Sequence, residues 1–168
     1  MSEPEVWLRG RVEGYEAMVL PVVHSLLQVR EDLARLEQKV TPAHLWARPG
    51  GAASIGFHIR HTAGALDRLL TYARGETLSA EQRSFLEREE ASGDPPATLA
   101  SLVAEANRMI DRSLDQLRAI SPDRLLDERR VGRAGLPSNV LGLLVHAAEH
   151  STRHMGQAIT TALILEGS

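Results

Sequence analysis

The sequence contains no cysteine, and this absence narrows the chemistry that the chain can perform. Without cysteine there are no disulfides, no protein thiolate to act as a nucleophile and no zinc site with Cys ligands. His, Asp and Glu remain as the strong protein ligands for a metal. Any chemistry of this chain is therefore expected to be imidazole chemistry.

Aromatic residues are scarce, with two each of Phe, Tyr and Trp, whereas Leu and Ala abound. This balance favours helices over strands and predicts an all-α fold. A chain of 168 residues can bury a sizeable core without being divided. Residues 1–168 are therefore expected to form a single domain.

The chain also lacks an excess of positive charge and a long apolar run. Its 19 basic and 22 acidic residues are interspersed and give a formal net charge of −3. A phosphate backbone requires a broad cationic surface, so no nucleic-acid partner is expected. No segment approaches the roughly 20 apolar residues of a membrane span, and the charged N-terminus has no apolar signal core. The sequence predicts a soluble cytoplasmic protein without membrane association.

Apolar residues recur at intervals of three and four in four long segments, which is the spacing of amphipathic helices. Pro21 is expected to bend or interrupt the first helix. Ser54 and Thr98 are expected to cap the second and third helices, and Gly75 to end the second. Together with one extended connection, this pattern predicts a four-helix bundle. The long segments are residues 4–40, 55–74, 99–120 and 139–165; a short acidic helix is expected at 79–90 and a polar connection at 123–138.

Five of the seven histidines lie in two of these expected helices. His146, His150 and His154 follow one another at intervals of four residues, and His58 and His61 lie far upstream. Residues at i and i+4 share a helix face, and neutral imidazole is the commonest metal-binding side chain. The pattern is typical of a three-histidine metal site between helices.

Helical spacing ranks the three histidines of the last helix. At about 100° per residue, His154 falls within the apolar arc, His150 at its edge and His146 at the polar border. His150 and His154 are therefore the better pair of ligands. The alternative is that each inward imidazole only fills the core and hydrogen-bonds a buried partner. Two neutral imidazoles on one core face favour a shared partner, which a divalent cation supplies.

Helical spacing leaves two alternatives for the third ligand. Periodicity favours His58, about 60° from the centre of the apolar stripe, whereas His61 is about 120° away. His61, however, lies within one turn of Gly64 and Ala65, whose small size leaves room for a ligand or substrate. The pattern alone does not choose between His58 and His61.

Two motifs and the order of the helices resemble a known family. The segments are SIGFHIRH (residues 54–61) and HSTRHMGQ (residues 150–157). They resemble the helix-start motif and the H-x-x-x-H run with a following Gly-Gln of the DinB-like (damage-inducible) superfamily, four-helix-bundle metalloenzymes related to bacterial thiol transferases. In that family the metal-binding histidine falls seven residues after the capping Ser or Thr. The resemblance implies the metal ligands His61, His150 and His154.

The same resemblance implies Zn²⁺ or Ni²⁺ as the metal, an up-down-down-up bundle with one long crossover connection, and a homodimer. Two positions depart from the family pattern. Met155 stands where many members carry Arg, which argues against an anion contact there. Gly156 stands where relatives of the ergothioneine pathway carry Glu, which argues against an iron oxygenase that forms sulfoxides.

Three neutral imidazoles leave a divalent ion with an open position for water or a substrate atom. Such an ion lowers the pKa of bound water to about 7 or stabilises a bound thiolate. We therefore expect a metal-dependent enzyme, a thiol transferase or a hydrolase, whose small-molecule substrate includes a low-molecular-weight thiol in the first case. Gln157 is a candidate for orienting bound water.

Two other interpretations are kept. In the first, the protein is a non-catalytic metal-binding or stress-response bundle that acts as an interaction module. A closed structural site of this kind needs a fourth protein ligand, such as His58. In the second, the chain is a dimerisation bundle without a metal.

Overall fold

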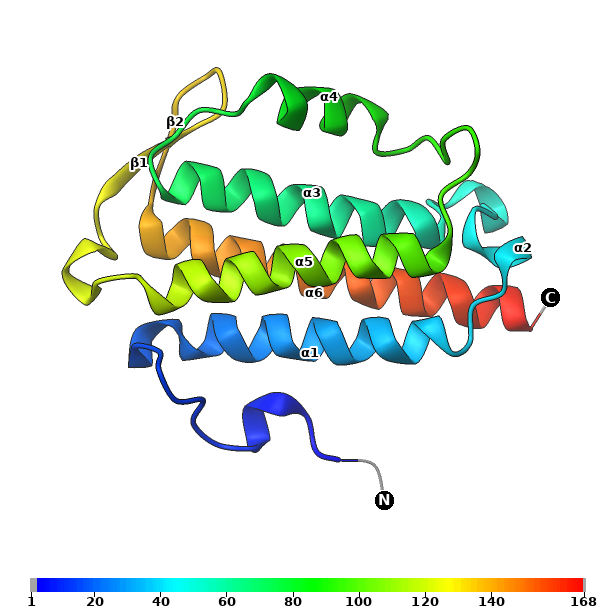
Figure 1. The fold of residues 1–168 in the computed structure, drawn as a ribbon, viewed down its shortest axis with the longest axis horizontal. Helices are drawn as coiled ribbons and strands as arrows, with labels where there is room; N and C mark the ends of the chain where they lie inside the picture. The colour runs from blue at the N-terminus through cyan, green and yellow to red at the C-terminus, as the bar shows by residue number, and fades with distance from the viewer. Residues whose placement is uncertain (1–2, 168) are drawn as a thin grey trace.

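The computed structural model describes residues 3–167, and most of them are helical, in agreement with the predicted fold class. Four long helices lie side by side, and a shorter helix and a β-hairpin lie beside them (Figure 1). The long helices are α1 (Leu20–Glu37), α3 (Ile55–Ala73), α5 (Leu99–Arg118) and α6 (Val140–Glu166). The shorter elements are α2 (Pro42–Leu45), α4 (Ala80–Arg88), β1 (Glu128–Val131), β2 (Leu136–Asn139) and four 3₁₀ turns at Val6–Leu8, Ala17–Val19, Pro49–Gly51 and Pro122–Arg124.

Helices α3 and α1 each pack against both α5 and α6. The colour scale of Figure 1 shows that the chain runs one way along α1 and α6 and the opposite way along α3 and α5. Helix α3 packs most extensively on α6. The two helices that carry the five clustered histidines are therefore antiparallel neighbours.

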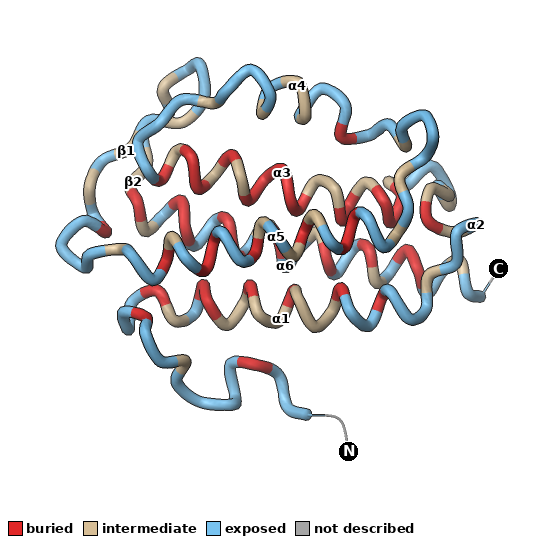
Figure 2. The backbone as a smooth tube through the Cα atoms, in the orientation of Figure 1, coloured by how far each residue is buried: buried red, intermediate tan, exposed pale blue. Residues whose placement is uncertain are grey.

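The hydrophobic core lies between the four long helices, where the buried positions of Figure 2 face one another. The apolar stripe expected on α5 is confirmed, because its members from Leu102 to Leu117 are buried. Within residues 3–167, no helix combines the length and the apolar character that a membrane span requires. The largest side chains with almost no exposure include Leu26, Leu33, Ile59, Leu66, Ile110, Leu144 and Met155.

The expected start and end of α3 and the expected start of α5 are confirmed. The Ser54 hydroxyl accepts a hydrogen bond from the backbone N–H of Phe57 at 3.1 Å, and Thr98 accepts from the N–H of Ser101 at 3.2 Å. Each cap satisfies one of the free donors of a first helical turn. Gly75 follows α3 with φ of +84°, a conformation that glycine adopts without steric cost. These signals fix where α3 starts, and so where its histidines lie.

The prediction of one helix from residue 4 was wrong for its first part, because α1 begins only at Leu20. Pro21 lies in the first turn of α1, where a backbone N–H has no partner within the helix. Proline therefore loses no hydrogen bond there, and it starts the helix instead of bending it. Gly10 and Gly14 have φ of +92° and +82°, which are not helical values. Trp7 lies in the 3₁₀ turn Val6–Leu8 of this segment and is 61% exposed.

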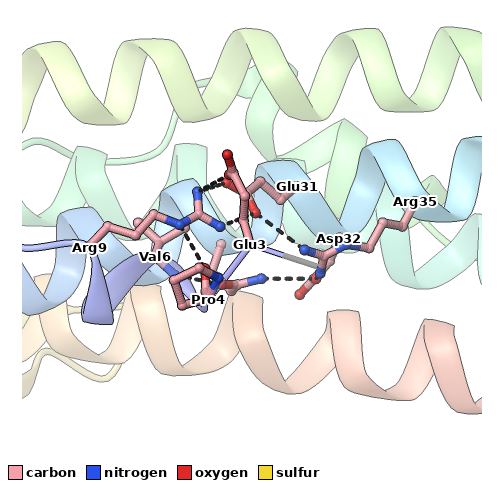
Figure 3. A network of polar contacts seen from close by, with 8 residues as sticks. Glu3, Pro4, Val6, Arg9, Glu31, Asp32 and Arg35 are labelled. Atoms are coloured by element: carbon pink, nitrogen blue, oxygen red, sulfur yellow. Dashed lines mark hydrogen bonds and ion pairs between the residues drawn. The ribbon is translucent and has the colours of Figure 1, made fainter. Parts of the chain in front are cut away.

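The N-terminal segment lies along α1 and is held there by polar contacts (Figure 3). Arg9 donates to Glu31 through two guanidinium nitrogens, one of them at 2.9 Å. The backbone N–H of Val6 donates to the side chain of Gln28 at 3.1 Å. These contacts replace the helical hydrogen bonds that this part of the chain was expected to form.

The connection at residues 123–138 contains a β-hairpin that the sequence pattern did not predict. Strands β1 and β2 pair antiparallel, with Val131 opposite Leu136. Gly132 and Gly135 in the turn have positive φ values, for which glycine is suited. Arg129 donates to the backbone carbonyl of Ala73 at 2.7 Å and so ties the hairpin to the end of α3. Short α2 was not predicted either.

Candidate metal centre

Helices α3 and α6 bring three histidines together. His61 lies two turns into α3, and His150 and His154 lie one turn apart on α6. One ring nitrogen of each side chain lies within 4.8 Å of those of the other two, so the group could hold a metal ion. The Nε2 atoms of His61 and His150 are 2.8 Å apart, and the ring centroids of His61 and His154 are 4.4 Å apart. The three residues that the family motifs indicated thus converge at one place.

His58, the alternative that periodicity favoured, lies outside this group. Its side chain is buried, with only 5% exposed, so the helical wheel placed it correctly in the core. Its Nδ1 atom lies 3.0 Å from Nδ1 of His154. The wheel measures burial and not convergence with another helix, and this difference explains why periodicity favoured a residue outside the converging group.

Other expected residues fall at the surface. His146 is exposed, as the wheel indicated, and its Nδ1 lies 3.5 Å from a carboxylate oxygen of the exposed Glu149. Gln157 is also exposed and is not part of the histidine group, so its position does not support a role in orienting bound water. Met155 is 1% exposed and belongs to the core.

Glu89 is the residue of this site that the sequence did not reveal. It follows α4 and is only 3% exposed. The Nδ1–H of His61 donates to Oε2 of Glu89 at 2.6 Å, and the guanidinium of Arg68 donates to Oε1. In the sequence Glu89 lies in the charged run EREE, which is typical of a solvated helix end. No pattern in that run indicates which carboxylate is buried.

Burial favours the neutral form of His150 and His154. It lowers the pKa of His154 to about 4, with smaller contributions from His61 and His150, because a desolvated imidazolium ion is unfavourable. Burial first, and then His61, also lowers the pKa of His150 and of His58. Metals bind the neutral imidazole. His150 and His154 are therefore in their metal-binding form at neutral pH.

The Glu89 carboxyl, in contrast, is held in its charged form. Burial alone would raise its pKa, but the hydrogen bonds from His61 and Arg68 outweigh this effect, and the pKa is lowered. The group is thus a carboxylate that only accepts hydrogen bonds. Nδ1 of His61 is thus the donor, and in the neutral imidazole Nε2 is then the nitrogen with a free lone pair.

The arrangement fits a divalent cation. The Nε2 lone pair of His61 faces Nε2 of His150, and a cation is the partner that both nitrogens can share. Nδ1 of His150 is buried and has no hydrogen-bond partner among residues 3–167. Three neutral imidazoles from two helices are a donor set of zinc sites, in which water or a substrate takes a further position.

Phe57 links the histidines to a small cavity. Its ring stacks on that of His61, with centroids 5.3 Å apart and planes inclined by 23°. Phe57 also lines a cavity of about 170 Å³, together with Trp46, Ser54 and Ser92. A cavity of this size accommodates a small group, such as part of a metabolite.

Comparison with known proteins gives a family and a fold. A family model described as the DinB superfamily matches residues 25–158, a range that includes all three histidines. No curated protein matches the sequence. Among solved structures, the crystal structure of a conserved protein of a locus from Enterococcus faecalis is similar, with a TM-score of 0.69 and 18% identity. The alignment covers 89% of this chain and 98% of that one, and at this identity the likeness concerns the fold alone.

Proposed function

The chain belongs to the DinB superfamily, and from this membership and the histidine geometry we propose that it binds a divalent metal ion through His61, His150 and His154. The observation that carries the proposal is the convergence of three ring nitrogens, one from each residue, to within 4.8 Å of one another. The lowered pKa values of His150 and His154 support it, because neutral nitrogens compete weakly for protons and remain available to the ion.

We propose Zn²⁺ or Ni²⁺ as the ion and a small molecule as the substrate. When bound, such an ion acts as a Lewis acid that lowers the pKa of a coordinated water or thiol. The protein's part is to hold the imidazoles neutral and converged, and to cover one face of His61 with the ring of Phe57. The reaction class is that of a thiol transferase, with a low-molecular-weight thiol, or of a hydrolase.

An open coordination position separates this proposal from a purely structural metal. In the part of the chain that the structure describes, no fourth His, Asp or Glu joins the three-residue group. His58, the candidate fourth ligand of a closed site, lies outside this group. This geometry supports an ion that is accessible to a substrate and disfavours the alternative of an ion that only staples the helices.

The finer features of the fold belong to the same proposal. We propose that residues 1–168 form a single DinB-like domain in which the long helices make an up-down-down-up bundle. The packing of α1 and α3 against α5 and α6 supports this topology, as do the helix directions in Figure 1. The segment between α3 and α5 is then the long crossover connection. The homodimer and the cytoplasmic location stay predictions.

The test is the metal content of protein purified without a metal-affinity tag and measured by mass spectrometry. We expect about one Zn²⁺ or Ni²⁺ ion per chain, as a three-histidine site requires. His61→Ala should lose the ion, because it removes one of three ligands, whereas His58→Ala should retain it. The two variants form a matched pair, since both remove one imidazole from the same helix. Absence of an ion from the unaltered protein, or its loss only in His58→Ala, would show that the proposal is wrong.

A further inference from the structure

We propose that Glu89 is a positioning residue that orients the His61 imidazole toward the metal, and that Arg68 holds the Glu89 carboxylate in place. The inference rests on the proposed function, since it assigns the residue that prepares one of the three ligands. It also gives a role to the crossover segment, because Glu89 lies directly after α4 and α4 itself has no buried residue.

The contacts of Glu89 are divided between two side chains of α3. One oxygen accepts from Nδ1 of His61 at 2.6 Å and the other accepts from the Arg68 guanidinium. The side chains of all three residues are largely withdrawn from solvent, with 4% of Glu89, 10% of Arg68 and 17% of His61 exposed. A buried carboxylate with both oxygens bound keeps a single orientation. It therefore also holds the imidazole in a single orientation.

This contact determines which nitrogen of His61 is free. A carboxylate can only accept, so the donor is Nδ1–H of His61, and in the neutral form that binds metals Nε2 then carries the lone pair. Nε2 is the atom that lies 2.8 Å from Nε2 of His150. Histidines that bind metals commonly donate their other N–H to a carboxylate, which fixes the tautomer and increases the basicity of the ligand. Glu89 has this relation to His61.

The space for Glu89 is created by Gly64, one turn after His61. A Cβ atom at position 64 would lie 2.8 Å from a guanidinium nitrogen of Arg68 and 2.5 Å from the ring of Phe85, and closer still to Oε1 of Glu89. Any other residue would therefore displace the carboxylate or its arginine. The approach of α4 to α3 at this point depends on the missing side chain.

The other two ligands have no such partner. In residues 3–167, neither His150 nor His154 hydrogen-bonds to a carboxylate: Nδ1 of His154 faces His58, and Nδ1 of His150 has no partner. His61 is thus the one member of the group whose tautomer the protein fixes through a charged group. The loss of Glu89 should affect metal binding through His61 alone.

The first experiment measures Zn²⁺ affinity by competition with a chromophoric chelator. Glu89→Gln keeps the size of the side chain and removes its charge, and we expect Zn²⁺ affinity to fall by about 10- to 100-fold, as for other outer partners of metal-bound histidines. The matched control is Glu87→Gln, the same change at an exposed residue of α4, which should leave the affinity unchanged. Equal affinities of Glu89→Gln and Glu87→Gln would overturn the inference.

A second variant separates positioning from folding. If Glu89 only neutralised Arg68, the double variant Arg68→Gln/Glu89→Gln would remove the unpaired charge and restore wild-type Zn²⁺ affinity. We expect the double variant to fold and to bind Zn²⁺ as weakly as Glu89→Gln, because the carboxylate is still missing from His61. Restored affinity would overturn the inference.

The second measurement does not depend on the metal. Two-bond ¹⁵N–¹H correlation spectra of metal-free protein identify which ring nitrogen of His61 is protonated. We expect Nδ1–H in the wild type and a mixture of tautomers in the double variant. A wild-type Nε2–H tautomer would overturn the positioning role whether or not zinc binds. Failure of the proposed function is distinguishable, because then the wild type itself would bind no Zn²⁺ while the tautomer result stands.

Discussion

Two networks of arginine and carboxylate hold segments outside the long helices onto them, and they differ in burial. The buried network comprises His61, Arg68 and Glu89 and joins the end of α4 to α3. The N-terminal network joins the first residues to α1 through Arg9 and Glu31 (Figure 3). Side-chain exposure is 4% for Glu89 but 32% for Glu31.

The difference shows that the same pair of residue types serves two purposes. An exposed pair gains little, because water solvates both charges and screens their attraction. A buried pair contributes little net stability when intact, yet losing one partner is expensive, because the other charge stays desolvated. The N-terminal network thus attaches a segment at the surface of α1, whereas the buried network fixes the position of the His61 imidazole.

The largest expected effect comes from removing the carboxylate of each network in turn. Glu89→Ala leaves the Arg68 guanidinium buried without its partner and should lower the free energy of unfolding by about 3–5 kcal/mol. Glu31→Ala makes the same change at an exposed pair and should lower it by a small fraction of that amount. Urea denaturation of metal-free protein measures both. Equal losses would contradict the distinction between the two networks.

A second difference concerns pH, because the two regions should lose stability in different pH ranges. The pKa of His154 is about 4 in the folded protein, against an ordinary value of 6.5. As the pH falls from 6.5 to 4, the unfolded chain binds a proton that the folded chain does not, so the free energy of unfolding decreases. After allowance for partial exposure, we expect a loss of about 2 kcal/mol between pH 7 and pH 4.5. Urea denaturation of metal-free protein at these two pH values measures it.

The N-terminal network gives the control for this pH dependence. The hydrogen bond from Arg9 lowers the pKa of Glu31, so its contribution is present above the ordinary value of 4.5 and is lost only as the pH falls further. Glu31→Ala should therefore keep the loss between pH 6.5 and pH 4.5, and His154→Ala should reduce it. We expect His58 and His150, whose pKa values are also lowered, to cause the loss of stability that remains in His154→Ala. A loss that His154→Ala leaves unchanged would contradict the assignment.

The parts of the fold that the sequence predicted are those set by local signals. Helices α3 and α5 follow from the spacing of their apolar residues and from the caps Ser54 and Thr98. All of these signals lie within the helix concerned or directly before it. The start of α1 was missed because a proline inside an apolar pattern is compatible with a kink or with a first turn. The hairpin was missed because its short polar strands have no alternating pattern and its attachment to Ala73 comes from tertiary contact.

The candidate metal centre likewise combines residues that local patterns predict with one that only tertiary contact determines. His150 and His154 follow from helical spacing, and His61 needed the family motif because periodicity reports burial and favoured His58. Glu89 could not be predicted, because its burial depends on how the crossover segment lies on α3. Nothing in a run of charged residues distinguishes the carboxylate that faces a histidine from its solvated neighbours. The sequence thus indicates the converging histidines more readily than the carboxylate that contacts one of them.

The smallest expected effect, and the sharpest comparison, is Gly64→Ala against Gly10→Ala. Alanine at position 64 crowds Arg68 and Phe85, and after the gain in helix propensity we expect a loss of about 1 kcal/mol. Alanine at position 10 meets no atom within 4 Å but must adopt φ of +92°, which costs about 1–2 kcal/mol if the turn keeps its shape and less if the exposed segment relaxes.

Unfolding measurements alone do not separate these two variants, whereas Zn²⁺ affinity does. Gly64→Ala displaces Glu89 from His61 and should weaken Zn²⁺ binding, because the imidazole loses the carboxylate that orients it. Gly10→Ala changes only the N-terminal segment on the outer face of α1 and should leave Zn²⁺ binding unchanged. Equal Zn²⁺ affinities for the two variants would mean that the close approach of α4 to α3 serves packing alone and that the buried network has no part in preparing the metal site.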